Sequence, residues 1–282
     1  MPLARTALEQ PPSTLTVEVD PRWTMAFAAG IPDTRPALYA TDAPAGLVVH
    51  PLFPVAAEWQ LITTARAAGT GLDRDEARRG IHVGHDLVLL AALPARATLE
   101  LSVRTVAVDR RRAGATQTVE FSARHDGREV WRTRMTTLYL GVELAGDPAS
   151  VAAPWPDDVA EAPGGELARA TTEVRTVDAH VYSECARIWN PIHTDITAAT
   201  AAGLQAPILH GTATLARSVS IAATLAEVPL DAIRRISGRF SGQVELGSTF
   251  DVRLLGRDDT TVWFDAVRPD STPLLRSTSF TT

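Results

Sequence analysis

A histidine and a glycine in the C-terminal part of the chain have the surroundings of an acid–base group and an anion-binding group. His193 ends the tetrapeptide "NPIH", in which Asn190 suits a helix N-cap and Pro191 suits the first helical position. Because a helix start disfavours positive charge, we expect His193 to stay neutral and able to accept a proton from a substrate. The alternative is that both polar residues only stabilise the turn.

A second motif, His210-Gly211, precedes "TATLARSVSIAATLAEV", whose small and aliphatic residues favour a helix. A glycine that opens a helix lets a ligand approach bare backbone amides, and such amides can hold the oxyanion that develops when a thioester enolate forms. We therefore interpret Gly211 as an oxyanion-binding residue, with a tight helix entry as the alternative. His210 is either a substrate-binding residue or a group that holds the turn.

The composition limits the function classes. The chain has 282 residues, of which 45% are hydrophobic and 21% charged, which is enough for two domains or one large one. Its net charge of −6 gives no basic field for nucleic acid. The single cysteine, Cys185, offers neither a disulfide framework nor a cysteine metal site. Without a secretory signal or a membrane-spanning run, we expect a cytoplasmic protein without a membrane partner.

Three pairs of segments repeat along the chain at similar offsets. Asp20 of "TVEVD" matches Asp178 of "RTVD", an offset of 178 − 20 = 158 residues. His50 of "GLVVHPLFP" matches His210 of "APILHGTAT", an offset of 210 − 50 = 160 residues. Thr98 of "LPARATLELSVRTVAV" matches Thr249 of "VELGSTFDVRLLG", an offset of 249 − 98 = 151 residues. The three offsets indicate a tandem duplication. We predict an N-terminal unit at 1–146, a linker rich in proline, glycine and acids at 147–168, and a C-terminal unit at 169–282.

Each copy has the same order of predicted elements. An alanine-rich helical part comes first, and alternating strands close the copy, which indicates an α+β fold with an antiparallel sheet wrapped on a central helix. The predicted helical parts are residues 23–30 in the first copy and 182–189 and 195–203 in the second. The predicted strands cover residues 97–110, 116–127 and 130–144, and lie within 242–282.

Taken together, "NPIHTD", "ILHG", "VVHPLFP" and "HVGHDLVLLAALP" resemble the MaoC-like, or R-specific enoyl-CoA hydratase 2, family. The resemblance implies a double hot-dog fold in which only the C-terminal copy is catalytic. It implies addition of water to an enoyl thioester, or the reverse dehydration, with His193, Asn190 and Gly211 as the catalytic residues. Coenzyme A or a carrier-protein phosphopantetheine would be part of the substrate, so neither a separate cofactor nor a metal is expected.

One residue departs from the family motif. The resemblance places a catalytic aspartate at the position of Ile188, which can neither accept a proton nor orient water. Glu184, one helical turn earlier, and Asp195, two residues after His193, are candidate replacement carboxylates, and Asp178 is a weaker one. Alternatively, His193 works alone, which would suit an isomerase, a cyclase or a thioesterase. A non-catalytic acyl-binding protein is the remaining alternative.

Further residues are candidates for substrate binding. Arg187, which stands where the resembling loop commonly has glycine, and Arg239 could bind phosphate or carboxylate groups. Trp189 is expected in the core or in a pocket wall. Three histidines of the first copy, His50, His82 and His85, have no Asn-Pro loop beside them, so structural or interface roles are favoured. We expect a homodimer, with a monomer as the alternative.

Overall fold

Strands form where apolar and polar side chains alternate, as the sequence predicts. β3 (Ala97–Arg111) alternates buried and exposed side chains along most of its length. β4 (Gly114–His125) and β5 (Arg128–Leu140) are joined by a turn through Asp126 and Gly127, which have φ values of 49° and 73°. Two successive residues with positive φ favour the hairpin turns that match the twist of the strands.

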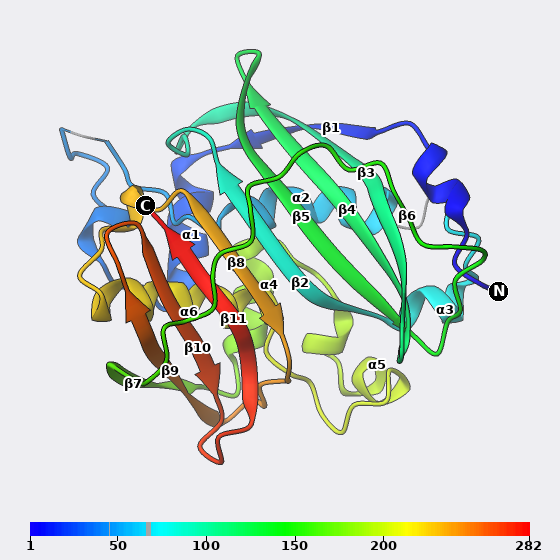
Figure 1. Cartoon of the computed structure of the whole chain (residues 1–282). Helices are drawn as coiled ribbons and strands as arrows, with labels where there is room; N and C mark the ends of the chain where they lie inside the picture. The colour runs from blue at the N-terminus through cyan, green and yellow to red at the C-terminus, as the bar shows by residue number, and fades with distance from the viewer. Residues whose placement is uncertain (45, 66–68) are drawn as a thin grey trace.

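The computed structural model describes residues 1–282 except 45 and 66–68. Within the described residues, the strands form one 11-stranded sheet with the order β1-β3-β4-β5-β2-β8-β11-β10-β9-β7, and β6 pairs with β3 (Figure 1). The remaining strands are β1 (Ser13–Val19), β2 (Gly80–Leu89), β6 (Ala149–Ser150), β7 (Ala168–Val174), β8 (Arg235–Phe240), β9 (Ser248–Arg257), β10 (Thr261–Val267) and β11 (Pro273–Thr281).

The strand order reads as two copies of one arrangement. From the seam outwards, β2, β5, β4, β3 and β1 on one side correspond to β8, β11, β10, β9 and β7 on the other. The seam itself is the antiparallel pair β2–β8, in which His85 lies opposite Gly238 and Leu87 opposite Ile236. The internal repeat in the sequence therefore corresponds to a repeat of elements, joined into a continuous sheet by the shared edge.

The helices repeat in the same way. α1 begins at Pro21, where the Asp20 carboxylate accepts a hydrogen bond from Trp23 N at 2.8 Å. The α1 helix packs against α4, and at Gly30 a side chain would come within 2.8 Å of Cys185 Cβ. The helical elements are η1 (Arg5–Glu9), α1 (Pro21–Gly30), η2 (Pro36–Leu38), α2 (Pro54–Ala65), α3 (Arg74–Arg78), α4 (Asp178–Ala186), η3 (Pro191–His193), α5 (Ile196–Ala201), α6 (Gly211–Leu225) and η4 (Leu230–Ala232).

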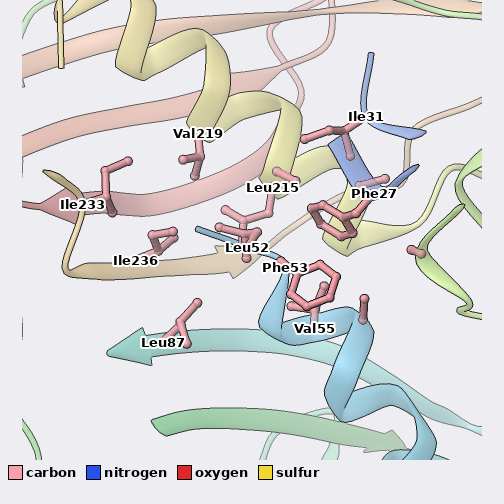
Figure 2. Close-up of a cluster of buried hydrophobic side chains, with 14 of the residues drawn as sticks. Phe27, Ile31, Leu52, Phe53, Val55, Leu87, Leu215, Val219, Ile233 and Ile236 are labelled. Carbon is pink, nitrogen blue, oxygen red and sulfur yellow. The ribbon is translucent and has the colours of Figure 1, made fainter. Parts of the chain in front are cut away.

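The inner face of the sheet and the helices share a hydrophobic core that crosses the seam. Figure 2 shows Leu215 of α6 near Phe27 of α1 and Phe53, next to α2, while Leu87 and Ile236 extend from β2 and β8. These five side chains are almost completely buried. Because both copies contribute to this cluster, burial of apolar surface holds the two halves of the sheet together.

The segment between the copies crosses the outer face of the sheet (Figure 1). Residues 151–167 contain no helix or strand in the part of the chain that is described. Trp155 donates a hydrogen bond to Asp86 on β2 at 3.0 Å, and its ring stacks with the Arg134 guanidinium of β5 at 4.1 Å. The bounds predicted for the units and their linker remain a prediction, but this segment is fastened to the sheet. Among the described helices, none is long and apolar enough to cross a membrane.

Candidate active site

The loop that carries His193 is a short 3-10 turn between α4 and α5. Asn190 caps it, although its side-chain oxygen lies 3.5 Å from Ile192 N, at the limit of a hydrogen bond. His193 is 8% exposed, and its Nδ1 donates to the carbonyl oxygen of Ile208 at 2.8 Å. This hydrogen bond holds the proton on Nδ1 and leaves Nε2 as the nitrogen that can accept one.

His193 is neutral for a different reason than the sequence suggested. A three-residue 3-10 turn has no appreciable helix dipole, so the predicted effect of a helix start does not apply. Burial instead lowers the pKa of His193 to about 4, and the hydrogen bond to Ile208 opposes this only in part. The imidazole is therefore an uncharged base near neutral pH.

His210 lies flat against His193. Their rings stack with centroids 3.7 Å apart and an angle of 26° between planes. Nε2 of His210 lies 3.2 Å from Ser183 Oγ and 3.4 Å from the Ile188 carbonyl oxygen, so these contacts connect α4, the loop and α6. Burial, and then the neighbouring His193, lower the pKa of His210, which keeps this ring neutral as well. Both predicted roles, lining the site and holding the turn, are compatible with this geometry.

Gly211 begins α6, directly after His210. The amides of the first turn of a helix have no intrahelical partner and point out of the helix end. A side chain at Gly211 would lie 3.2 Å from the Phe240 ring, so glycine leaves room for a ligand at this end. The equivalent dipeptide in the first copy is His50-Pro51, and a proline has no amide hydrogen to donate.

The two motifs border one pocket of about 360 Å³. His193, Asn190, His210 and Gly211 line it from the C-terminal copy. The opposite wall comes from α2 and β2 of the N-terminal copy. Its size is that of a small-molecule site, and it lies where the two copies meet. Among the described residues, no group of three or more histidine, cysteine or acidic side chains is placed to hold a metal ion.

The N-terminal copy contributes three polar side chains to this pocket that sequence reasoning did not assign to it: Glu58, His82 and His85. An irregularity in the pairing of β2 with β5 falls between His82 and Gly84. A bulge adds one residue and so changes the side-chain alternation, which brings two histidines three positions apart to the same pocket. His82 and His85, for which structural or interface roles were predicted, thus also line the pocket.

His50 does have the interface role. Its Nε2 lies 3.0 Å from Ser220 Oγ on α6, and Leu52 N donates to its Nδ1 at 3.1 Å. Ser220 in turn donates to Asp33 Oδ2 at 2.6 Å, so two residues of the first copy hold the central helix of the second. Because the backbone occupies Nδ1, the proton lies on Nε2 and points at the serine. The trio therefore cannot activate Ser220 as a nucleophile.

Glu58 is a buried acid on α2 and is 2% exposed. Its Oε1 accepts hydrogen bonds from Trp131 Nε1 at 2.8 Å and Thr133 Oγ1 at 2.6 Å. Burial raises the pKa of Glu58 to about 8, against the effect of these hydrogen bonds. The carboxyl group is thus protonated near neutral pH. No strong signal identified this residue in the sequence, because the helix that carries it was not predicted.

Comparisons with known proteins match part of this chain to a known domain family. Residues 158–267 match the family model described as MaoC like domain. The C-terminal half of the chain contains a MaoC-like domain. Among curated proteins, no match to the sequence was found.

Solved structures extend the similarity to the whole chain. A MaoC-like dehydratase from Phytophthora capsici has a TM-score of 0.86 at 17% identity, covering 98% of this chain and 96% of that one. Full-length peroxisomal multifunctional enzyme type 2 from Drosophila melanogaster has a TM-score of 0.75 at 22% identity, covering 96% of this chain and 48% of that one. A Mycobacterium tuberculosis protein described as having a double hotdog fold has a TM-score of 0.60 at 13% identity, covering 96% and 95%. The predicted double hot-dog fold is confirmed.

Ile188 stands where the resemblance places an aspartate, so the loop has no carboxylate at that position. Ile188 lines the pocket and is 4% exposed. Glu184 is not among the described residues of the pocket; it is exposed and accepts a hydrogen bond from Trp189 Nε1 at 3.2 Å. Asp195 is exposed and caps α5 by accepting from Thr197 N at 2.7 Å. Neither is placed to replace the missing aspartate.

Three other residues predicted to bind substrate are also absent from the described lining of the pocket. Arg187 ends α4 with a φ of 58°, and its guanidinium stacks over the Trp23 ring at 4.2 Å. Trp189 is 57% exposed, which contradicts the expected place in the core or in a pocket wall. Arg239 is exposed on β8. The described residues that line the pocket include no arginine. The weaker carboxylate candidate, Asp178, pairs with buried Arg217 at 2.9 Å.

The pKa of Glu58 gives a pH dependence of stability. Its pKa rises from 4.5 to about 8 on folding, so the folded chain keeps a proton that the unfolded chain releases. Stability is therefore lost as pH rises between these values, by roughly 1.4 kcal/mol per pH unit at the steepest. We expect Glu58→Gln to remove this loss when urea unfolding is followed across this range. Parallel pH profiles for the wild type and the variant would contradict it.

Proposed function

We propose that the chain is a hydro-lyase acting on acyl thioesters, which interconverts a 3-hydroxyacyl and an enoyl thioester with His193 as the acid–base group. One observation carries the proposal: the accepting Nε2 of His193 and the free amides at Gly211 belong to the same pocket. The substrate would be a thioester of coenzyme A or of a carrier-protein phosphopantetheine, with no further cofactor. A cytoplasmic homodimer also remains a prediction, and sedimentation velocity can test its mass.

The proposed dehydration needs one base and one anion site. Nε2 of His193 removes the proton from C2 of the substrate, and the electron pair of that C–H bond moves toward the thioester carbonyl to form an enolate. The thioester oxygen gains negative charge during this step and accepts hydrogen bonds from the amides at Gly211. The enolate electron pair then forms the C2=C3 double bond as the C3–O bond breaks, and the leaving hydroxide takes the proton from Nε2 to form water. Hydration is the same sequence in reverse.

Ile188 favours a second candidate function. A hydrophobic side chain at this position leaves His193 without a second group to orient water, and so disfavours hydration more than proton transfer within the substrate. A double-bond isomerase would use the same base and the same oxyanion site. His193 would then remove a proton from one carbon and return it to another, without forming water.

Turnover of defined substrates separates these functions. The protein would be incubated with 3-hydroxyacyl-CoAs and enoyl-CoAs of increasing chain length, and products identified by mass spectrometry. Gain or loss of one water supports the hydro-lyase. Movement of the double bond without a change of mass supports the isomerase and overturns the hydro-lyase. Binding without any turnover would indicate the acyl-binding alternative.

Gly211→Pro tests the oxyanion site. Proline suits the first position of a helix and reproduces the His50-Pro51 of the first copy, so the fold should tolerate the change. Loss of this amide should lower kcat by about 10²-fold, because one oxyanion donor is worth on the order of 3 kcal/mol. Gly211→Ala is the control, since it adds a side chain beside Phe240 but keeps the amide. Equal rates for both variants would contradict a role for the amide.

A further inference from the structure

Starting from Gly211, a row of ring contacts leads along the pocket to the histidines of the N-terminal copy. Phe240 borders Gly211, and the His82 ring lies 4.5 Å from the Phe240 ring, centroid to centroid. The His85 ring follows at 5.5 Å from the His82 ring. A thioester held at Gly211 would therefore place the distant part of its acyl chain, rather than its C2 and C3 atoms, near His85.

His85 has an unusual environment. It is 4% exposed and lines the pocket, and neither ring nitrogen has a hydrogen-bond partner among the described residues. Buried polar atoms in folded proteins are nearly always hydrogen-bonded, so an unpaired buried imidazole suggests that a bound ligand supplies its hydrogen-bond partner. Apolar residues of β2 and β8 continue the same wall, and a simple alkyl chain would leave both nitrogens unsatisfied.

The register of the sheet relates Glu58 to His85 through Thr133. Thr133, which donates to Glu58, is opposite Leu87, and the next pair on that face is Met135 opposite His85. Thr133 and His85 are therefore diagonal neighbours about 7–8 Å apart, and Glu58, bonded to Thr133, lines the same pocket as His85. Oε1 of Glu58 already accepts two hydrogen bonds. The proton of the carboxyl group can therefore lie on Oε2, from which it can be donated to a ligand.

We propose that His85 and Glu58 form a subsite for a hydroxyl group on the acyl chain of the substrate, beyond the carbons that react. A hydroxyl both donates and accepts, so it can accept from the Glu58 carboxyl group and donate to an imidazole nitrogen of His85. This inference rests on the proposed function, since it names the substrate class of the same pocket. It assigns selectivity to the N-terminal copy and chemistry to the C-terminal copy.

The charges of the subsite favour a neutral ligand group. Burial lowers the pKa of His85 to about 4 and raises that of Glu58 to about 8, so both groups are uncharged near neutral pH. No arginine is present among the described residues that line the pocket, so a carboxylate on the acyl chain would lack a partner. An ammonium group would meet a protonated acid instead of a carboxylate.

Binding of unreactive acyl-CoAs tests the subsite independently of turnover. The probes are octanoyl-CoA and hydroxyoctanoyl-CoAs in which the hydroxyl is moved along the chain beyond C3, with affinities measured by calorimetry. We expect at least one hydroxylated probe to bind the wild type about tenfold more tightly than octanoyl-CoA. His85→Leu should abolish that preference without weakening octanoyl-CoA, because leucine replaces an unpaired polar side chain by an apolar one.

Two further variants complete the test. Glu58→Gln keeps a donor and an acceptor and should keep the preference, and His125→Leu, in the β4–β5 hairpin, is a matched histidine control. Octanoyl-CoA binding as tightly as every hydroxylated probe, or a preference that survives His85→Leu, would overturn the subsite. Absence of binding by all acyl-CoAs would overturn both proposals. A hydroxyl preference without turnover of any thioester would overturn the hydro-lyase alone.

Discussion

Replacement of His193 by glutamine is expected to lower the turnover of 3-hydroxyacyl or enoyl thioesters on the order of 10³–10⁴-fold. In the proposed mechanism, the only group that removes and returns the proton is Nε2 of His193, and an acid–base group is typically worth 10²–10⁴-fold in rate. Glutamine can still donate to the Ile208 carbonyl, which His193 does at 2.8 Å. The loop should therefore keep its shape, and the measurement is kcat with saturating substrate.

A matched control for this variant is His180→Gln on α4, because His180 is exposed and does not belong to the described lining of the pocket. Its kcat should equal that of the wild type. Acyl-CoA binding by His193→Gln, measured by calorimetry, should change far less than its turnover. If the variant retained more than about a tenth of the wild-type rate, another residue would have to act as the base, and the single-base mechanism would be wrong.

Ile188→Asp is expected to raise the rate of hydration by roughly 10²-fold or more. Ile188 lines the pocket together with His193 and is 4% exposed. A carboxylate there can hold a water and share its protons with His193, as the family motif implies. The measurement is the rate of water addition to an enoyl-CoA, followed by loss of the ultraviolet absorbance of the conjugated double bond.

Ile188→Asn separates the chemistry from the change in polarity. Asparagine has nearly the same shape as aspartate but cannot act as a base, so we expect it to give no comparable gain. Thermal unfolding of both variants shows how far a polar group in this wall destabilises the fold, a cost that both variants share. A rate for Ile188→Asp equal to or below that of the wild type would mean that Ile188 does not occupy the place of the catalytic carboxylate.

The sequence correctly predicted which residues of the C-terminal copy would share a site when local backbone rules determined their positions. His193, Asn190, His210 and Gly211 lie in one pocket, because capping residues, Asn-Pro and a glycine at a helix start determine the backbone locally. The internal repeat also appears in the order of strands and helices. Local rules and internal periodicity thus predicted two α+β copies and one wall of the site, while the double hot-dog fold came from the family resemblance.

Where the prediction failed, the reason was a break in regularity. Glu184 was expected to share a helical face with Ile188, but α4 ends at Ala186 and Arg187 adopts a left-handed conformation. That turn breaks the spacing of one helical turn and leaves Glu184 and Trp189 exposed. The opposite wall was missed because His82 and His85 reach the pocket only through a pairing irregularity and a long-range strand contact. Neither leaves a pattern in a single sequence.

The seam between β2 and β8 gives the chain two parts that can change separately. Gly211 and His193 belong to one copy, while Glu58 and His85 belong to the other, and within the sheet the two copies meet in a single strand pair. The first copy has Pro51 where the second has Gly211, so it lacks the backbone amide that would bind an anion at this position. Exchanging the first copy among double hot-dog proteins would thus be a route to new substrate ranges that leaves the reacting groups untouched.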